Sequence, residues 1–565
     1  MSPPKNPRSD VSRRDVIRGA AATVVVAWVG TPLTSCNGTS PSAPDGGRQP
    51  EGGPSPEAGL AGKNILVIMT DQERFTINWP AGFTAQNLPA LTRLQNNGLT
   101  FTNAYTAACE CSPSRAVMMT GQFSNTTGVA VTFTPLPVSS KFPSLGTLLA
   151  AKSNYAPLWK GKWHLANAIA GGNAPSAWTA ADIAAMQTHY GWTGWNPADA
   201  GTAIITPAQE ALATSGGGKA NNDARYVSGP ESTALGGAQS VVDFLTNTAP
   251  TLGQPFCLFV ALVNPHDVSA YPDAFVAAGY TASDFTSLGI AVPANYTDDL
   301  STKPSIQAAY SAQCMSAFSD GQGGYVQSEL EGYVNFYAYL HTVVDAQIAA
   351  ILAALDSAGL TNDTIIIRTA DHGEAGLSHA MTEKSYTAYE EMTHIPFIVS
   401  NPVLFPTAQT TAAFYDHQDL LPTILDLAGV ANPNSFGNGV GQSIVPVIND
   451  PTTSVRDHTL FAYDDVFGLS AGAPGSHIRS MRQNDTDGQW TYSVYFNPSG
   501  GAYEYELYNL AVDPGQTQNL LATPPTSTIT AKWQALHTTL TASFTTANQL
   551  PTGWPTVPVL ADGGV

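Results

Sequence analysis

Apolar runs alternate with helical patterns along the middle of the chain. Residues 64–69 are a near-continuous apolar run that ends at once in Thr-Asp-Gln, as expected for a buried parallel strand. Residues 333–360 have the apolar spacing of a long helix that stops at Gly359, and residues 363–374 follow as a strand that ends in an Asp-His pair. Strands that alternate with helices predict an α/β fold, a mostly parallel sheet with helices on both faces.

The length of 565 residues exceeds one typical core, so the chain predicts one large domain with a smaller partner. We expect the large α/β domain over residues 61–449 and a smaller C-terminal α+β domain over residues 450–565 that packs against it. Two segments rich in Ala, Gly and Ser, about 168–235 and 268–330, have poor periodicity. They indicate loop-like insertions of the kind that carry specificity.

The first 60 residues are predicted to be a targeting signal followed by a linker. Paired arginines, Arg13 and Arg14, precede a short Ala-rich apolar run that resembles a bacterial twin-arginine export signal. Small residues then lead into Cys36, which resembles a lipobox, so residues 1–36 are expected to be a signal with Cys36 lipidated; a simple cleavable signal is the alternative. Residues 37–60, rich in Gly, Pro and Ser, predict a flexible linker. We expect an exported protein, either a cell-envelope lipoprotein or secreted.

The charge balance limits the partners. Asp and Glu number 43 against 23 Lys and Arg, which gives a formal net charge of -20. That charge argues against binding to nucleic acid or to anionic membrane surfaces, so any membrane contact is expected only through the N-terminal lipid. An anionic ligand must then be met by a local cluster of cations.

Cysteine is scarce, and its pattern is chemical more than structural. Five cysteines, an odd number, do not form a disulfide framework. Cys109 and Cys111 stand one residue apart in the sequence Cys-Glu-Cys-Ser-Pro-Ser-Arg. If Cys36 carries lipid and Cys111 is modified, at most one bridge remains, and pairing of Cys257 with Cys314 stays open.

Single acidic residues at strand ends carry little information by themselves. An isolated Asp71 or Asp371 is more often a helix N-cap than a metal ligand, and a lone His372 is more often satisfied by packing. Cations and imidazoles elsewhere in the chain change this interpretation, because such groups around hard oxygen ligands suit a divalent cation bound together with an oxyanion. These candidates are Arg115, Lys162, His164, His266 and Lys384.

Residues 111–121, Cys-Ser-Pro-Ser-Arg followed by Ala-Val-Met-Met-Thr-Gly, resemble the C-x-P-x-R signature of the sulfatase family in the alkaline phosphatase superfamily. Other elements follow in family order: KNILVIMTDQ, GKWH, NPHD, TADHGE, the segment around Lys384, DLLPTILDLAGV and ELYNLAVDPGQTQNLL. The resemblance covers roughly residues 61 to 525 and implies the alkaline phosphatase/sulfatase-like fold. It implies hydrolysis of sulfate esters to an alcohol or phenol and inorganic sulfate.

In the family, the signature cysteine is oxidised to Cα-formylglycine by a separate formylglycine-generating enzyme. The resemblance therefore implies that Cys111 is a precursor residue and Cys109 a bystander. An aldehyde hydrate offers two hydroxyls on one carbon, one to attack sulfur and one to expel sulfate afterwards, whereas a serine or thiol would leave a stable ester. Pro113 suits the start of a helix, which would place the nucleophile at a helix N-terminus that favours an anion.

The resemblance also implies a metal site. Asp71, Gln72, Asp371 and His372 would hold a divalent cation, calcium or another, together with the formylglycine oxygen from Cys111. Many sulfatases have an aspartate where Gln72 stands and an asparagine where His372 stands, so whether Gln72 ligates the metal stays open. The pairs found here also occur in choline-sulfatase-like and phosphonate-hydrolase-like branches. A phosphonate monoester or phosphodiester hydrolase is therefore the alternative, and a non-catalytic binding protein is a third hypothesis.

The remaining roles are carried over from the family. Lys162 and Lys384 would bind sulfate oxygens, and His266 with Lys384 would protonate the leaving alkoxide. His164 would be the general base that collapses the hemiacetal, and Arg115 would reach back to the modified side chain. Because the surface outside the site is acidic, we expect a small sulfate ester as the substrate.

Overall fold

A computed structural model describes residues 59–75, 78–132, 134–138, 141–166, 180–195, 223–229, 239–465 and 477–558. The predicted export signal with Cys36, and almost all of the predicted linker, lie outside the described residues. So does most of the first predicted insertion.

The centre of the molecule is a seven-stranded sheet with the strand order β3-β4-β1-β5-β6-β2-β7. Only β6 runs antiparallel to its neighbours. The strands are β1 (Asn64–Asp71), β2 (Gly98–Tyr105), β3 (Ala156–Gly161), β4 (Phe256–Pro265), β5 (Thr364–Ala370), β6 (Phe397–Ser400) and β7 (Gln409–Asp416). The predicted mostly parallel α/β sheet is confirmed.

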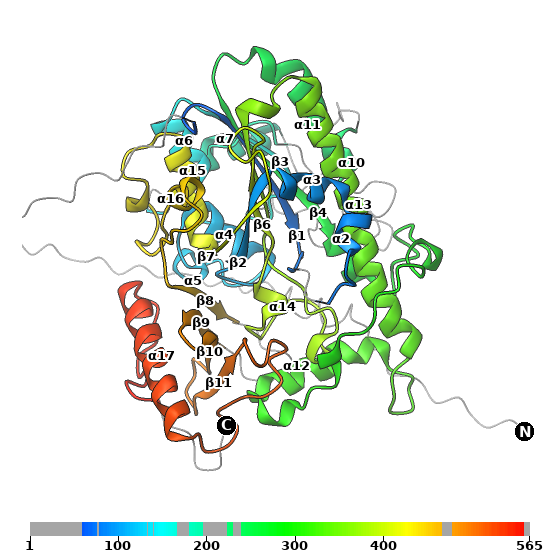
Figure 1. Cartoon of the computed structure of the whole chain (residues 1–565), viewed down its shortest axis with the longest axis vertical. Helices are drawn as coiled ribbons and strands as arrows, with labels where there is room; N and C mark the ends of the chain where they lie inside the picture. Colours follow the sequence, from blue (N-terminus) through cyan, green and yellow to red (C-terminus); the bar gives the residue numbers. More distant parts are fainter. Residues whose placement is uncertain are drawn as a thin grey trace, which may run out of the picture.

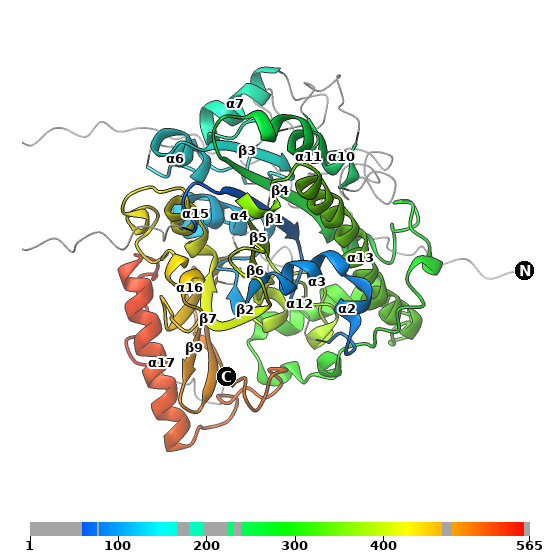
Figure 2. The same cartoon turned by 45° about the horizontal axis from the view of Figure 1, so that its top comes forward.

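Helices cover both faces of this sheet (Figure 1). Alternate residues of a strand point to opposite faces, and the core divides accordingly. In β1, Leu66 and Ile68 pack with α3 (Pro89–Asn96) and α13 (Gln327–Ser357). Ile65, Val67 and Met69 pack on the other face, against helices α4 (Cys111–Thr120), α6 (Leu145–Lys152) and α15 (Leu420–Leu427). Figure 2 shows α13 and α15 on opposite sides of the sheet.

The long helix predicted near residues 333–360 is α13, and it ends where Gly359 adopts a positive φ of 69°. Among the described residues, α13 alone is long and apolar enough to cross a membrane by length and composition. Its Phe336, Leu340 and Val344 are instead buried in the core against the sheet. Burial in a large protein accounts for a helix of this composition.

The remaining α-helices of the described residues are all shorter than α13, and most lie in the connections. They are α2 (Phe83–Asn87), α5 (Ser124–Thr127), α7 (Ala180–Tyr190), α10 (Ala224–Val227), α11 (Val241–Asp243), α12 (Ser305–Met315), α14 (Glu390–Thr393), α16 (Val445–Asn449) and α17 (Ser527–Thr546). The segment 268–330 is therefore less loop-like than expected. It contains α12 and several 3₁₀ turns, because Ile306, Tyr310 and Met315 pack into the core.

A second, antiparallel sheet forms the C-terminal α+β part, as predicted. Its order is β11-β10-β9-β8, from β8 (His458–Asp464), β9 (His477–Asp485), β10 (Gly488–Phe496) and β11 (Glu504–Asn509). The helix α17 lies along it (Figure 1). Tyr492 and Val494 of the sheet and Leu540 and Phe544 of the helix share one buried cluster.

A buried ion pair joins this second sheet to the segment that follows Lys384, at the first residue of α14. Arg482 of β9 donates from Nε to Glu390 Oε1 at 2.5 Å, and from Nη2 to the carbonyl oxygen of Ala388 at 2.6 Å. Burial alone would raise the pKa of Glu390, but Arg482 lowers that pKa to about 2. The C-terminal sheet thus supports one wall of the site described below.

The described cysteines are Cys109, Cys111, Cys257 and Cys314; all are buried, and no disulfide joins any of them. The open question of pairing between Cys257 and Cys314 is thereby answered.

Candidate active site

The site lies at one edge of the seven-stranded sheet. The neighbouring strands β3, β4, β1 and β5 run parallel, so their carboxyl ends meet at the same edge. Lys162 follows β3, His266 follows β4, Asp71 ends β1 and Asp371 follows β5. Ligands in open α/β sheets gather at this position. The fold thus brings together groups that are about 300 residues apart in the sequence.

Cys111 is the first residue of α4, and Pro113 lies in the first turn of that helix, as predicted. Every residue of α4 is buried. Two serines of the helix tie it to the strand ends: Ser112 Oγ donates to the carbonyl oxygen of His164 at 2.7 Å, and Ser114 Oγ to that of Asp371 at 2.5 Å. Cys111 therefore lies against the sheet edge with its side chain toward the helix N-terminus.

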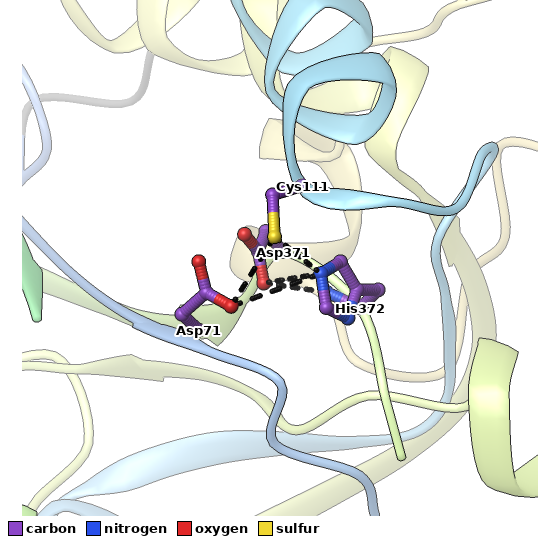
Figure 3. A group of neighbouring side chains, drawn as sticks. All are labelled: Asp71, Cys111, Asp371 and His372. Atoms are coloured by element: carbon purple, nitrogen blue, oxygen red, sulfur yellow. Dashed lines mark hydrogen bonds and ion pairs between the residues drawn. The ribbon is translucent and has the colours of Figure 1, made fainter. Parts of the chain in front are cut away.

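Asp71, Cys111, Asp371 and His372 converge, and their possible ligand atoms all lie within 4.8 Å of one another (Figure 3). The Cys111 sulfur is 3.5 Å from Asp71 Oδ1 and 3.3 Å from His372 Nε2. His372 Nδ1 lies 3.0 Å from the carbonyl oxygen of Gly373, which can only accept, so Nε2 keeps its lone pair toward the cluster. Two carboxylates and this nitrogen form a donor set that fits a divalent cation.

Two cations hold the carboxylates in place. Arg115 donates from Nη2 to Asp71 Oδ2 and from Nε to Asp371 Oδ2, each at 2.9 Å, and from Nη1 to the carbonyl oxygen of Lys162 at 2.7 Å. Lys162 Nζ lies 2.6 Å from Asp71 Oδ2 and 3.6 Å from the Cys111 sulfur. Arg115, expected to reach back toward Cys111, thus has its guanidinium on the two carboxylates, while Lys162 bridges a carboxylate and the sulfur.

The two carboxyl groups have opposite pKa directions. Burial would raise the pKa of Asp71, but Lys162, His266 and Arg115 hold it well below its usual range. Burial, and then the charge of Asp71, raise the pKa of Asp371. Burial lowers the pKa of His372, which keeps the imidazole neutral as a ligand must be. A divalent cation would offset the repulsion between the two carboxylates.

As an unmodified thiol, Cys111 would be a poor nucleophile. Burial, followed by the charge of Asp71, raises the pKa of its thiol to about 12, so the thiol is protonated near neutral pH. Since the thiolate is the nucleophile in cysteine chemistry, an unmodified Cys111 would be almost inert. Cys109 has its sulfur 3.5 Å from the carbonyl oxygen of Met392, and burial raises its pKa well above the usual range. Thiol catalysis is therefore disfavoured at both positions.

Two histidines flank the cluster as neutral bases. Burial, and then Lys162 and Arg115, lower the pKa of His164 well below its usual range. Burial, and then Lys162 and Lys384, do the same for His266. The buried Nδ1 of His266 has no hydrogen-bond partner within the described part of the chain, which leaves it available to a ligand.

Gln72 and Lys384 contact each other beside the acidic cluster. The amide oxygen of Gln72 accepts a hydrogen bond from Lys384 Nζ, and its Nε2 donates to Glu374 Oε2 at 2.5 Å. Burial opposes the charge of Lys384, yet Cys111, Glu383 and Asp71 hold its pKa well above the usual range. Glu374 was not assigned a role from the sequence, although it lies in the TADHGE element; a carboxylate three residues beyond a metal-ligand candidate was the available signal.

Comparisons with known proteins identify the family. The profile of the Sulfatase family matches residues 63–430, and that of the C-terminal part of N-sulphoglucosamine sulphohydrolase matches residues 378–543. The chain therefore belongs to the sulfatase family. It is a sulfuric ester hydrolase.

Curated relatives cover most of the chain. Arylsulfatase K of Bos taurus is 24% identical over 489 residues, which cover 84% of this chain and 81% of the relative. The Delta 4,5-hexuronate-2-O-sulfatase of Bacteroides thetaiotaomicron is 24% identical over 492 residues, which cover 84% and 87%.

Solved structures share the fold. A 2-O GAG sulfatase has a TM-score of 0.60 at 21% identity, covering 86% of this chain and 92% of that one. A protein in complex with its substrate D-glucosamine-2-N,6-O-disulfate has a TM-score of 0.60 at 20% identity, covering 86% and 98%. The phosphonate monoester hydrolase of Silicibacter pomeroyi has a TM-score of 0.59 at 22% identity, covering 89% and 99%.

Proposed function

We propose that this sulfatase acts through a Cα-formylglycine made from Cys111. The observation that carries the proposal is a buried, protonated cysteine at a helix N-terminus, in a C-x-P-x-R sequence, within 3.6 Å of Asp71, His372 and Lys162. A thiol gains nothing from these neighbours, because burial keeps it protonated. An aldehyde hydrate at the same carbon could interact with all three of these neighbours, as charged partners and as bases.

In the first half-reaction, one hydroxyl of the hydrate would attack the sulfur of the ester and lose its proton, and the bond from sulfur to the alcohol oxygen would break. The proton lost by the hydroxyl balances the one that the alcohol takes up. Lys162 and Lys384 bind the sulfate oxygens, and their charges oppose the negative charge that develops there. His266 and Lys384 face the departing oxygen, which leaves as the alcohol or phenol once it has taken a proton. The negative charge of the bound sulfate favours the protonated form of His266, whereas burial and then the two lysines lower its pKa in the free site.

In the second half-reaction, His164 takes the proton from the remaining hydroxyl. The carbon-oxygen bond to sulfate breaks, the aldehyde re-forms and inorganic sulfate leaves; water then adds to the aldehyde and restores the hydrate. His164 suits this role because burial and the nearby Lys162 keep its imidazole neutral. The hydrogen bond from Ser112 to the His164 carbonyl holds it beside the first turn of α4.

The cofactor we propose is Ca²⁺, although the imidazole also admits other divalent cations. Asp71, Asp371 and His372 would hold it with the formylglycine oxygen. A bound cation would supply charge compensation to the transferring group. The Gln72 oxygen, which already accepts from Lys384, would contribute only by giving up that hydrogen bond.

A phosphonate monoesterase is the second candidate, favoured by the Gln72 and His372 replacements. We expect sulfate to be preferred when one aryl group is supplied as a sulfate monoester and as a phosphonate monoester. Sulfate presents three terminal oxygens to the cations and phosphonate only two, and one lost charged hydrogen bond is worth about 10- to 100-fold in kcat/KM.

Metal removal belongs to the same assay. Exhaustive chelation should abolish hydrolysis of both esters, and added Ca²⁺ should restore it. Equal or higher kcat/KM for the phosphonate would favour the second candidate, and full activity without metal would contradict the proposed cation.

The substrate we propose is a small sulfate ester. Lys162, Lys384 and Arg115 attract one sulfate at close range, but a polysulfated chain must also cross the surface of a protein with net charge -20. We expect an aryl sulfate to exceed a sulfated polysaccharide in kcat/KM at low and at moderate salt. The gap should narrow as salt rises, because screening acts beyond about 8 Å at physiological ionic strength. A polysaccharide preferred at low salt would contradict this proposal.

A further inference from the structure

We propose that Glu374 is a positioning residue that sets both the backbone and the ammonium group of Lys384, the second through the amide of Gln72. The inference rests on the proposed function, in which Lys384 binds the sulfate and faces the leaving oxygen. It gives Gln72 a role as a link between a carboxylate and a lysine.

Glu374 is fully buried and lies at the centre of a set of donors. Its Oε1 accepts from the Tyr333 hydroxyl at 2.7 Å and from the backbone N–H groups of Gly376 and Glu383, each at 2.9 Å. Its Oε2 accepts from Gln72 Nε2 at 2.5 Å. Four donors on one buried carboxylate fix its orientation. A route of two parts connects Glu374 with Lys384, and each carboxylate oxygen begins one part.

The first part of the route is the backbone. Glu383 immediately precedes Lys384 and has a positive φ of 69°, which is costly for a residue with a side chain. Its N–H donates to Glu374 Oε1, and its carbonyl oxygen accepts from the Ala375 N–H at 2.8 Å. The turn that directs Lys384 into the site is therefore built around Glu374 and the residue after it.

The second part of the route is the Gln72 side chain. An amide has a donor end and an acceptor end, and the partners decide which end points where. Nε2 donates to Glu374 and lies 3.2 Å from Glu383 Oε2, so the oxygen end points to Lys384 Nζ. The opposite orientation would place N–H groups against the ammonium and would set the amide oxygen against the carboxylates of Glu374 and Glu383.

The backbone of Gln72 is equally constrained, which keeps the link rigid. Gln72 has a positive φ of 65°, its N–H donates to Asp371 Oδ1 at 3.1 Å, and its carbonyl oxygen accepts from the Tyr337 hydroxyl at 2.7 Å. The amide therefore reaches Lys384 from a fixed base beside the candidate metal ligands. Loss of the correct amide orientation should displace the ammonium group without moving these ligands.

Glu374→Gln tests the inference with little change of shape. An amide at position 374 can keep its oxygen on the Tyr333 hydroxyl and the two backbone N–H groups, but its NH₂ group then meets the NH₂ group of Gln72. Turning Gln72 over would set donors against Lys384. We expect the dissociation constant of inorganic sulfate from the calcium-loaded, formylglycine-containing enzyme to rise about 10-fold, and kcat/KM for an aryl sulfate to fall about 10- to 100-fold.

The reciprocal double variant supplies the decisive comparison. Combining Gln72→Glu with Glu374→Gln places a carboxylate at position 72, which can accept from both Lys384 and the new amide, and leaves the total charge unchanged. Each single variant should lose sulfate affinity, and the double variant should recover at least about 10-fold relative to Glu374→Gln, a non-additivity that a general loss of packing would not produce.

Two measurements separate positioning from other effects. Ca²⁺ affinity by calorimetry should change less than about twofold in Glu374→Gln, because Asp71, Asp371 and His372 are not among the hydrogen-bond donors to Glu374. A matched control is Glu506→Gln, which alters another buried carboxylate held by tyrosine hydroxyls, those of Tyr389 at 2.9 Å and Tyr508 at 2.7 Å; it should retain wild-type sulfate affinity. Thermal unfolding of each variant monitors the fold.

The outcomes are distinct. Wild-type sulfate affinity in Glu374→Gln, or no recovery in the double variant, would overturn this inference while the proposed function stands. A parallel loss of Ca²⁺ and sulfate affinity would also overturn it, since Glu374 would then act through the metal. A wild-type enzyme that fails to hydrolyse any aryl sulfate would overturn the proposed function itself.

Discussion

Replacing Cys111 with alanine should abolish sulfate ester hydrolysis, with a loss in kcat of at least about 10⁴-fold, because the nucleophile disappears and no neighbouring group can replace it. In the proposed mechanism the surrounding carboxylates and imidazole hold the cation, and the thiol they surround is protonated in the unmodified chain. The measurement is single-turnover hydrolysis of an activated aryl sulfate at matched protein concentration, with thermal unfolding to confirm that the fold is retained.

Cys109→Ala is the matched control. Cys109 is also buried, two residues earlier, but its sulfur faces the carbonyl oxygen of Met392 instead of the acidic cluster. This variant should keep its kcat within a few-fold of wild type, since its cost is one of packing.

Mass spectrometry of the Cys111 peptide completes the test. Enzyme from its native host should contain an aldehyde or its hydrate at position 111, and enzyme made without a formylglycine-generating enzyme should contain a thiol and be inactive. Full activity in protein that contains only unmodified Cys111 would rule out the proposed mechanism.

The sequence predicted the structure best where candidate functional residues lie at the ends of strands. The apolar run at residues 64–69 predicted a buried strand, and residues 363–374 predicted a second strand that ends in an Asp-His pair. The structure confirms both strands and brings Asp71 and Asp371 together at one edge of the sheet. Parallel pairing places the carboxyl ends of neighbouring strands at the same edge of the sheet, and this does not depend on the length or conformation of the loops between them.

Prediction was weaker for side-chain partners. Arg115 was expected to reach back to the modified side chain of Cys111. In the structure its guanidinium donates to two carboxylates and to the carbonyl oxygen of Lys162, because a buried guanidinium is best satisfied by strong acceptors within reach. The amide of Gln72 was left open as a ligand, since one residue letter does not say which end of an amide points where. Its orientation depends on Glu374 and Lys384, which are about 300 residues away in the chain.

The segment 268–330 shows a further limit. Its many small residues weaken the helical periodicity, yet α12 forms there because Ile306, Tyr310 and Met315 find apolar partners supplied by other elements. Tertiary packing of this kind overrides local pattern and is invisible to a single sequence.

Replacement of each of the two active-site histidines should impair a different step of the reaction. His164→Ala should permit attack on sulfur but stall the release of sulfate, because no base remains to deprotonate the second hydroxyl. Steady-state turnover should fall about 10²- to 10⁴-fold while the alcohol is released in a first burst close to one per active site. A sulfated form of the enzyme should then accumulate, and intact-protein mass spectrometry after rapid quenching would detect it.

His266→Ala should instead slow the first step. The buried Nδ1 of His266 has no partner in the described part of the chain, and Lys384, the other proton source, remains in place, so the loss should depend on the leaving group. For a nitrophenol-like leaving group, which needs little protonation, kcat/KM should fall only a few-fold; for an alkyl alcohol it should fall about 10²-fold or more. A plot of log kcat/KM against leaving-group pKa should be steeper for His266→Ala than for wild type, and unchanged in slope for His164→Ala. If both variants gave the same slope, or if His266→Ala accumulated the sulfated enzyme, the assignment of the two histidines to separate steps would be wrong.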